Sequence, residues 1–310
     1  MDRDWKEDIG PDGPWGFEPI IDERIALTFG DAGENHVGME MVGELGKIGS
    51  GFSVSKLKKL KTYFEKKGKE VEFIDFGTRE DIYEKSKHSE KVSKKFVKDG
   101  KIIWNGGVLI VRNYLDKGKA NELYSSLKAY EWDSKYWDTR RKKVLNKHAR
   151  ANIVILDGVK QEPDYENCKG KILDTFEIKN KGGEEIFGDI KKRMVGEVNE
   201  GSESLKADNL ICEGNRYFNP KKCGIGFHGD KERRKVICLS LGVPTIMRWV
   251  WYKKSVPGEM FEVELRHGDM YIMSEKAVGY DWSMSSLYTL RHAAGCSKYI
   301  TPKQPKSKSK

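Results

Sequence analysis

The sequence predicts an α+β protein whose C-terminal part forms an antiparallel, barrel-like sheet. After residue 235, short runs rich in β-branched and aromatic residues follow one another between Gly, Pro and charged turns. Segments with helically spaced apolar residues precede these runs. A chain of 310 residues, 37% of them hydrophobic, can bury one generous core with additional elements around it.

Residues 1–100 are expected to form an N-terminal extension, to which no motif assigns a role. Within it, the apolar run at 25–29 predicts a strand, and the Gly- and Asp-rich segment 30–43 has the composition of a loop. Ser55 is expected to cap a helix that ends at Gly68, with its apolar residues on one face. The alternation at 71–76 predicts a second strand.

The middle of the chain alternates between strands and helices. The charged segment 80–101 lacks a sustained apolar face, which predicts a linker or a solvated helix. A buried strand is expected at 108–111, followed by a helix capped by Asp116, and another strand at 151–156. Apolar residues spaced through 186–198 predict a further helix before the chain enters the C-terminal sheet.

Composition favours an intracellular protein, cytoplasmic or nuclear. No apolar stretch approaches the roughly 18 residues of a membrane span, and the acidic start does not have the profile of a signal peptide. The cysteines are five in number and widely spaced, so the sequence suggests neither a disulfide framework nor a zinc site. We therefore expect free thiols, no membrane association and no obligate protein partner.

The net charge of +9 suggests nucleic acid, DNA or RNA, as a partner. The basic segment that ends the chain, 301–310, is expected to be a disordered tail. A second basic cluster is interleaved with aromatic residues, a combination that suits stacking on an unpaired base while phosphates are neutralised. Its residues, which we take as candidate substrate-binding residues, are Trp132, Trp137, Arg140 and Arg141. The alternative is that the two tryptophans pack the end of the preceding helix.

The pair His228 and Asp230 is the most informative feature of the chain. On an extended segment, residues two apart project to the same side, so an imidazole and a carboxylate can bind one metal ion together. A third ligand downstream would complete the two-histidine, one-carboxylate face of non-haem Fe(II) oxygenases. The histidines that follow are His267 and His292.

Several ordered motifs resemble the AlkB-type 2-oxoglutarate and Fe(II)-dependent oxygenases. They are N-R-Y at 215–217, H-x-D at 228–230, L-S-L-G-x-P-x-x-M-x-W at 239–249 and H-G-D-x-x-x-M at 267–273. The resemblance runs from about residue 211 to residue 299. It implies a double-stranded β-helix, or jelly-roll-like, core at about 208–300, flanked by N-terminal helices and strands. The oxygenase domain would span 101–300, with a substrate-recognition lid at about 130–155.

The resemblance also implies Fe(II), 2-oxoglutarate and O2 as cofactors, with Asn215 and Tyr217 hydrogen-bonded to the cosubstrate. In the better known family members, two arginines follow the distal iron histidine on a later strand, whereas no arginine follows His292 here. One alignment therefore puts Arg291 in the place of a cosubstrate arginine. The other, which we prefer, makes His292 the distal ligand and gives the anchoring role to a later lysine. The candidate anchors for the far carboxylate are Arg291, Lys298, Arg248 and Lys303.

The resemblance and the charge together suggest an enzyme that hydroxylates a C–H bond, oxidising a methylated base in DNA or RNA with release of succinate and CO2. One alternative is a prolyl or lysyl hydroxylase built on the same core. Another is a catalytically inactive relative that binds nucleic acid.

Overall fold

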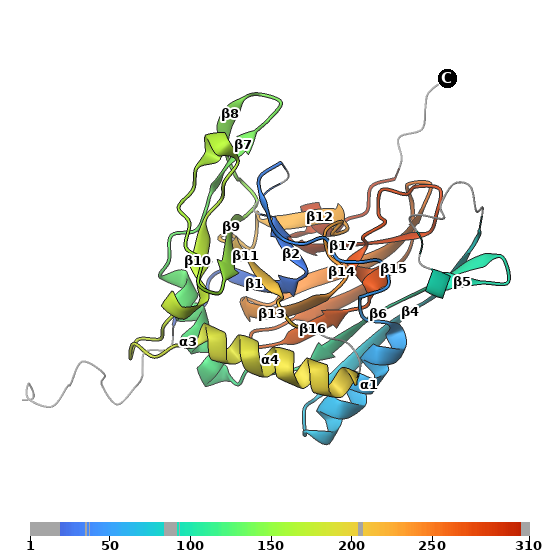
Figure 1. Ribbon diagram of the computed structural model, residues 1–310, viewed down its shortest axis with the longest axis horizontal. Helices are drawn as coiled ribbons and strands as arrows, with labels where there is room; N and C mark the ends of the chain where they lie inside the picture. Colours follow the sequence, from blue (N-terminus) through green and yellow to red (C-terminus); the bar gives the residue numbers. More distant parts are fainter. Residues whose placement is uncertain are drawn as a thin grey trace, which may run out of the picture.

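The structure, a computed structural model, describes residues 19–34, 36, 38–83, 92, 94–203 and 207–304. Residues 305–310, most of the predicted basic tail, lie outside this part, as do residues 1–18 of the predicted extension. Two large sheets and three longer helices make up an α+β fold (Figure 1).

A nine-stranded sheet is the largest element. Its strands run in the order β10 (Ile172–Asp174), β9 (Ala151–Leu156), β11 (Ile211–Tyr217), β1 (Arg24–Gly30), β13 (Val236–Gly242), β16 (Met270–Met273), β6 (Lys101–Val111) and β4 (Val71–Ile82), with β5 (Val97–Lys98) paired to β6. The N-terminal strand β1 therefore lies inside the sheet, antiparallel to both β11 and β13. Strands β1 and β4 come from the expected N-terminal extension, and they belong to the same sheet as strands β11, β13 and β16 of the C-terminal part.

A four-stranded antiparallel sheet carries the H-x-D motif. Its order is β12 (Gly224–His228), β17 (Thr289–Gly295), β14 (Thr245–Lys253) and β15 (Val256–Leu265). Two hairpins complete the described strands: β2 (Ala32–Glu34) with β3 (Met41–Gly43), and β7 (Lys135–Asp138) with β8 (Lys143–Asn146).

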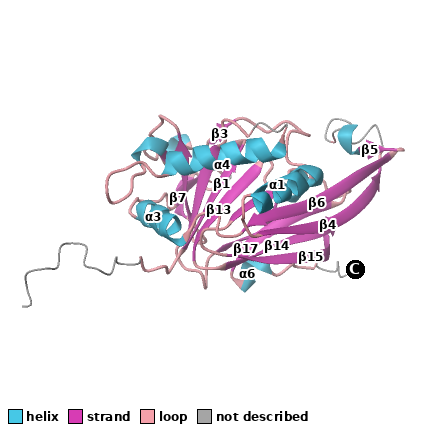
Figure 2. Ribbon diagram, turned by 90° about the horizontal axis from the view of Figure 1, so that it is seen from below, coloured by secondary structure: helices cyan, strands magenta, loops and turns pink. Residues whose placement is uncertain are grey.

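Three helices cover one face of the nine-stranded sheet, and the four-stranded sheet packs against the other face (Figure 2). The covering helices are α1 (Val54–Lys66), α3 (Lys117–Lys128) and α4 (Phe187–Ser202). The short elements are α5 (Glu275–Val278), α6 (Ser297–Ile300), η1 (Lys94–Phe96), η2 (Tyr165–Asn167) and η3 (Thr175–Glu177).

Strand β1 shows how alternation divides its side chains between the two layers. One set packs in the apolar core under the helices: Ile25, Leu27 and Phe29. The other set faces the space between the two sheets: Arg24, Ala26 and Thr28. The neighbouring strand β13 divides in the same way, with Ile237 on the helix side and Cys238 between the sheets.

Several local predictions are confirmed. Strand β9 spans the expected residues 151–156, and strand β1 extends the expected 25–29 by one residue at each end. Asp116 caps α3, since its carboxylate accepts a hydrogen bond from the backbone N–H of Lys119 at 2.9 Å. The series of strands after residue 235 is also present, as β13 to β16.

Three local predictions were wrong. Helix α1 is capped by Ser53 rather than Ser55, because Ser53 is extended and its hydroxyl accepts from the N–H of Lys56. The segment 30–43 contains the β2–β3 hairpin rather than loop alone. The segment 80–101, predicted as a linker or a solvated helix, is mainly strand where it is described: β4 runs through residue 82, β5 pairs with β6, and Lys94–Phe96 forms a short 3-10 helix.

Two findings concern the thiols and the length of the helices. All five cysteines are free thiols. Among the described helices, none combines the length and the apolar character needed to cross a membrane.

Candidate metal centre

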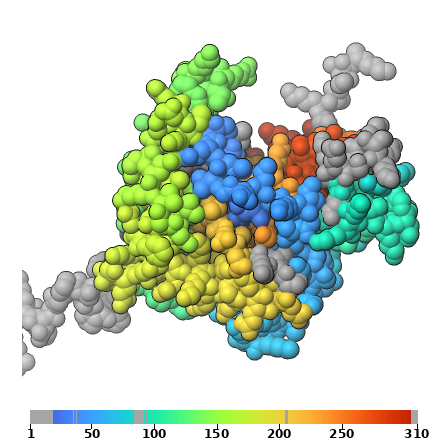
Figure 3. Space-filling model, viewed as in Figure 1, coloured from blue at the N-terminus to red at the C-terminus, as the bar shows by residue number. Residues whose placement is uncertain are grey.

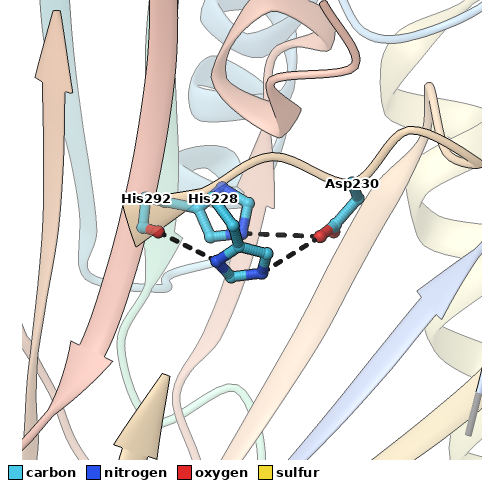
Figure 4. A group of neighbouring side chains, drawn as sticks. All are labelled: His228, Asp230 and His292. Atoms are coloured by element: carbon cyan, nitrogen blue, oxygen red, sulfur yellow. Dashed lines mark hydrogen bonds and ion pairs between the residues drawn. The ribbon is translucent and has the colours of Figure 1, made fainter. Parts of the chain in front are cut away.

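Two neighbouring strands of the four-stranded sheet bring the candidate ligands together. Strand β12 ends at His228, and β17 runs antiparallel to it with His292 directly opposite His228. Cross-strand partners project to the same face of a sheet, so both rings point to one side. Asp230 follows two residues after His228 and turns back toward the rings (Figure 4).

The three side chains converge on one point. His228 Nε2 lies 3.4 Å from Asp230 Oδ1, and His292 Nε2 lies 3.7 Å from the same oxygen. One ligand atom from each residue falls within 4.8 Å of the others, which is the spacing that a shared metal ion requires. The structure thus brings all three sequence-predicted metal ligands together.

The remaining ring nitrogens hold both imidazoles in the orientation that suits metal binding. His228 Nδ1 lies 2.8 Å from the carbonyl oxygen of Gly226, and His292 Nδ1 lies 3.3 Å from that of Ala277. A carbonyl oxygen only accepts hydrogen bonds, so each Nδ1 carries the hydrogen and donates. Each Nε2 then presents a lone pair, as metal-binding histidines do when their other nitrogen is bonded to the backbone.

Burial sets the protonation state of the ligands. It lowers the pKa of His292 to about 4, with a smaller contribution from the neighbouring His228. For Asp230, burial alone would raise the pKa, but the neighbouring His228, His292 and Arg233 lower it. His292 is therefore neutral and Asp230 ionised near neutral pH, which are the forms that bind a metal ion.

The backbone around Gly229 fixes the position of Asp230. The N–H of Asp230 donates to the carbonyl oxygen of Val278 at 3.0 Å, tying the loop after β12 to α5. A Cβ at position 229 would lie 2.0 Å from the carbonyl oxygen of Gly279. The middle residue of H-x-D must therefore be glycine for the two segments to approach so closely.

Arg233 holds the carboxylate of Asp230 through the oxygen that faces away from the histidines. Its Nη1 lies 3.3 Å from Asp230 Oδ2, its Nη2 donates to Glu213 on β11, and its Nε donates to the carbonyl oxygen of Ala32 at 2.7 Å. The guanidinium thus links the loop after β12 to two other strands. Asp230 keeps Oδ1 toward the histidines because Oδ2 is held by Arg233.

A cavity of about 650 Å³ opens beside the three ligands. It lies between the two sheets, and its lining residues come from β1, β11, β12, β14, β16 and β17 as well as the loop after β12. This volume is within the range of small-molecule sites. A metal ion held by the three ligands on one side would expose its other coordination positions to this cavity.

The predicted cosubstrate residues fall into two groups. Asn215 and Tyr217, from β11, line the cavity. Arg291 precedes the inward-facing His292 and so points to the opposite side of β17, where its guanidinium lies over the Tyr252 ring at 4.2 Å. Lys298 is exposed on α6, and neither cation is among the residues that line the cavity.

Sequence reasoning missed Arg24, a buried arginine that lines the same cavity. It begins β1, and its guanidinium lies 5.3 Å from the centre of the Tyr217 ring. The sequence did contain a signal, because the alternation after Arg24 places it on the face opposite Ile25, Leu27 and Phe29. What the alternation did not indicate was the sheet in which this strand would lie.

The predicted substrate residues also separate. Trp132 is 5% exposed in the core under the helices, with its Nε1 donating to the carbonyl oxygen of Leu127, so the structure places it as a packing residue. Arg140 and Arg141 are exposed at the turn of the β7–β8 hairpin, which Figure 3 shows projecting from the body of the molecule. Trp137 is half-buried on β7.

A ring contact joins the hairpin to the lining of the cavity. His36 lines the cavity, and its ring stacks on Tyr136 of β7 with 3.7 Å between centroids and 17° between planes. The exposed arginines of the hairpin therefore stand on an element whose base adjoins the candidate site.

Two further side chains that could bind a metal ion, His267 and the carboxylate of Asp281 in the loop after α5, are engaged elsewhere. His267 hydrogen-bonds through Nδ1 to the N–H of Gly242 at 2.8 Å and through Nε2 to Asn121. Asp281 forms a buried ion pair with Lys276 at 2.5 Å. Both have structural partners, which leaves His292 with His228 and Asp230 at the candidate centre.

Comparison with known proteins relates the chain to a viral protein. The chain is 37% identical over 281 residues to the uncharacterized protein R156 of Acanthamoeba polyphaga mimivirus, covering 90% of this chain and 98% of that protein. No family model matches the sequence.

Proposed function

The chain belongs to the family of the mimivirus protein R156, and we propose that it is an AlkB-like, Fe(II)- and 2-oxoglutarate-dependent oxygenase that hydroxylates a C–H bond. The substrate we propose is a methylated base in DNA or RNA. The observation that carries this proposal is the convergence of His228, Asp230 and His292 beside a cavity of about 650 Å³.

The ligand set supports a catalytic metal rather than a structural one. Three protein ligands leave coordination positions open, whereas structural zinc sites are closed by four. Two imidazoles and one carboxylate on one face form the donor set of non-haem Fe(II) oxygenases. Here the contacts of both Nδ1 atoms with backbone carbonyl oxygens fix the orientation of the two rings. The sequence motifs around the set argue for iron over other divalent metals.

The bound group would supply the oxidation itself: Fe(II), O2 and 2-oxoglutarate together hydroxylate a C–H bond and release succinate and CO2. The chain's own residues bind, orient and shield the reactants. His228, Asp230 and His292 would hold the iron. Asn215 and Tyr217 line the cavity and are the residues we assign to hydrogen bonding with the cosubstrate. Burial between the two sheets would exclude bulk water from the reacting atoms.

The fold supports a double-stranded β-helix as the core. The sheet β12–β17–β14–β15 packs against the central strands of the nine-stranded sheet, and one apolar core contains residues of both. The four-stranded sheet faces strands β11, β1, β13 and β16 of the nine-stranded sheet. In this row β1 lies between β11 and β13. In this arrangement His228 and His292 lie on the adjacent strands β12 and β17, and Asp230 lies in the loop that follows β12.

The β7–β8 hairpin supports a nucleic acid substrate. Its exposed turn carries Arg140 and Arg141, and Tyr136 of β7 stacks on His36, which lines the cavity. A base that leaves its stack to enter the cavity would bring its phosphates to the rim, where cations are needed. We assign Trp137, Arg140 and Arg141 to this rim.

The deciding experiment measures succinate from 2-oxoglutarate after anaerobic loading with Fe(II). We expect 2-oxoglutarate turnover, increased by oligonucleotides that carry methylated bases. Replacing His292 with Ala should weaken metal binding by more than about 100-fold, since even groups that only orient metal ligands contribute 10–100-fold. Metal binding is measured separately, with Mn(II), so that a metal defect is distinguished from a catalytic one.

His148→Ala is the matched control, because His148 is exposed and lies outside the cavity lining. It should bind Mn(II) and form succinate like the wild type. The oxygenase proposal is rejected if the wild-type protein binds the metal but forms no succinate with any methylated DNA, RNA or peptide tested.

A further inference from the structure

Arg24 presents a buried charge that its described surroundings leave partly uncompensated. Its side chain is 2% exposed, and neither Nε nor Nη1 has a partner among the described residues. Burying a guanidinium without an anion is unfavourable, so such a group is retained where something outside the chain's own contacts compensates it. The ring of Tyr217 beside it provides a favourable face but no acceptor for the N–H groups.

The position of Arg24 directs these donors into the candidate site. It shares one face of β1 with Ala26 and Thr28, and all three line the cavity that holds His228, Asp230 and His292. In the sheet register, Arg24 is the partner of Tyr217 on β11 and of Gly242 on β13. The cavity therefore has a metal-binding group and a buried guanidinium in its lining.

The other cations of the cavity are less suited to bind an anion deep inside it. Arg233 is already paired with Glu213 and Asp230. Lys231 is exposed, with its ammonium 5.5 Å from the Trp282 ring, and Arg150 is half-buried. Arg24 is the buried guanidinium of the lining without a carboxylate partner among the described residues.

We propose that Arg24, on the N-terminal strand β1, binds the far carboxylate of a 2-oxo dicarboxylic acid whose 2-oxo acid end faces the metal-binding triad. This inference rests on the proposed function and specifies its cosubstrate class. A guanidinium presents paired N–H donors that match a carboxylate in a bidentate geometry. Neither Arg291 nor Lys298 serves as this anchor, because they lie outside the cavity lining.

The assignment explains why the chain beyond His292 needs no arginine. After β17, the chain forms α6, and the place between β11 and β13 is filled by β1 from the other end of the chain. The anchoring cation is thus supplied by the first described strand rather than the last. Segments at opposite ends of the sequence form one site, and removal of β1 would remove both a central strand and the anchor.

The test compares cosubstrate binding by wild type, Arg24→Gln and Arg24→Lys, each loaded with Mn(II) in the absence of O2, by titration calorimetry. Charge-assisted hydrogen bonds of this kind contribute enough that Arg24→Gln should bind 2-oxoglutarate about 10- to 100-fold more weakly. Arg24→Lys should fall between the two, since it keeps the charge but not the fork. The Mn(II) affinity should be unchanged in both variants.

Two further arms make the result specific. 2-Oxobutyrate, which has the 2-oxo acid end but no far carboxylate, should bind equally to wild type and Arg24→Gln. Arg291→Gln and Lys298→Gln should bind 2-oxoglutarate like the wild type. Without ligand, Arg24→Gln should unfold at the same or a higher temperature than wild type, because the Nε and Nη1 donors that it removes have no hydrogen-bond partner among the described residues and the buried charge is relieved.

The outcomes separate the two levels of the proposal. Undiminished 2-oxoglutarate binding by Arg24→Gln overturns the assignment of Arg24, and so does an equal loss of 2-oxobutyrate binding or a lowered unfolding temperature of the ligand-free variant. A wild-type protein that binds Mn(II) but not 2-oxoglutarate overturns the proposed function, and this inference with it.

Discussion

The two faces of the nine-stranded sheet differ in what they bury. The face under α1, α3 and α4 is almost entirely apolar, with Ile25, Leu27 and Phe29 of β1 in its core. The face toward the four-stranded sheet also buries polar and charged groups, and those that line the cavity include Arg24, Glu213, Asn215, Asp230 and Arg233. The same strands contribute to both faces through alternate residues.

This difference teaches where stability and chemistry reside in the molecule. Apolar burial is favourable and tolerates little loss of volume, so the helix side holds the sheet together. Buried ions cost free energy unless they are paired, and Nε and Nη1 of Arg24 have no hydrogen-bond partner in the part of the chain that the structure describes. The helix-side core thus stabilises a sheet whose other face is free to present metal ligands and charges.

The largest effect is expected from a substitution in the apolar core under the helices, which should destabilise the fold without changing the cavity. Phe29 is 1% exposed and stacks on Phe187 of α4, with 5.8 Å between ring centroids. Phe29→Ala should lower the free energy of unfolding by about 3–5 kcal/mol, because it removes a large buried side chain and leaves a cavity. Denaturant unfolding measures this loss. The Mn(II) affinity of the folded protein should not change.

Thr28→Val is the matched control, one residue away on the opposite face. The hydroxyl of Thr28 makes a weak contact, 3.6 Å from Cys238 Sγ, so its loss should change the free energy of unfolding by about 1 kcal/mol or less. If the two substitutions destabilise the protein equally, the helix side of the sheet does not contribute more to stability than the cavity side.

A smaller effect is expected from a buried cation near the cavity. Burial lowers the pKa of Lys147 from 10.5 to about 8, and the charged groups around it are Asp133, Arg150 and Glu213. Between pH 8 and pH 10.5 the unfolded chain holds a proton that the folded protein has released, so the stability of the wild type should rise with pH across this window. The total rise should be up to about 3 kcal/mol.

Lys147→Met removes this titration and serves as the reference. At pH 7 the variant should be more stable than the wild type, and the difference should shrink as the pH approaches 10.5. Denaturant unfolding at several pH values measures it. If the difference in stability between the variant and the wild type stays constant with pH, the pKa of Lys147 is not lowered by folding and this prediction is wrong.

Local structure was predictable where a short pattern contains all the information. The apolar run at 151–156 and the carboxylate of Asp116 before an amphipathic run were sufficient to place β9 and the start of α3. The cap of α1 was misplaced because Ser53 and Ser55 both precede the apolar face. Only the extended conformation of Ser53 decides between them.

Partners distant in sequence were not predictable. The pattern of β1 fixes which of its side chains share a face, but its partners Ile211–Tyr217 and Val236–Gly242 lie far along the chain. The H-x-D spacing placed His228 and Asp230 together, whereas His292 was selected through a resemblance, and its place opposite His228 depends on strand register. Arg24 escaped notice because its burial follows from the insertion of β1 between two distant strands.

The smallest effect concerns the rim of the cavity, where polar character extends to the exposed β7–β8 hairpin. If Arg140 and Arg141 contact phosphates, replacing both with Gln should reduce the slope of log K against log salt by about 0.7 per arginine for a single-stranded oligonucleotide. Binding titrations at several salt concentrations measure this slope. Arg266→Gln is the control, since Arg266 is exposed at a turn outside the cavity lining and pairs with Glu264. An unchanged slope in the double variant would exclude the hairpin as a phosphate-binding rim, and tight peptide binding with little salt dependence would instead favour a protein substrate.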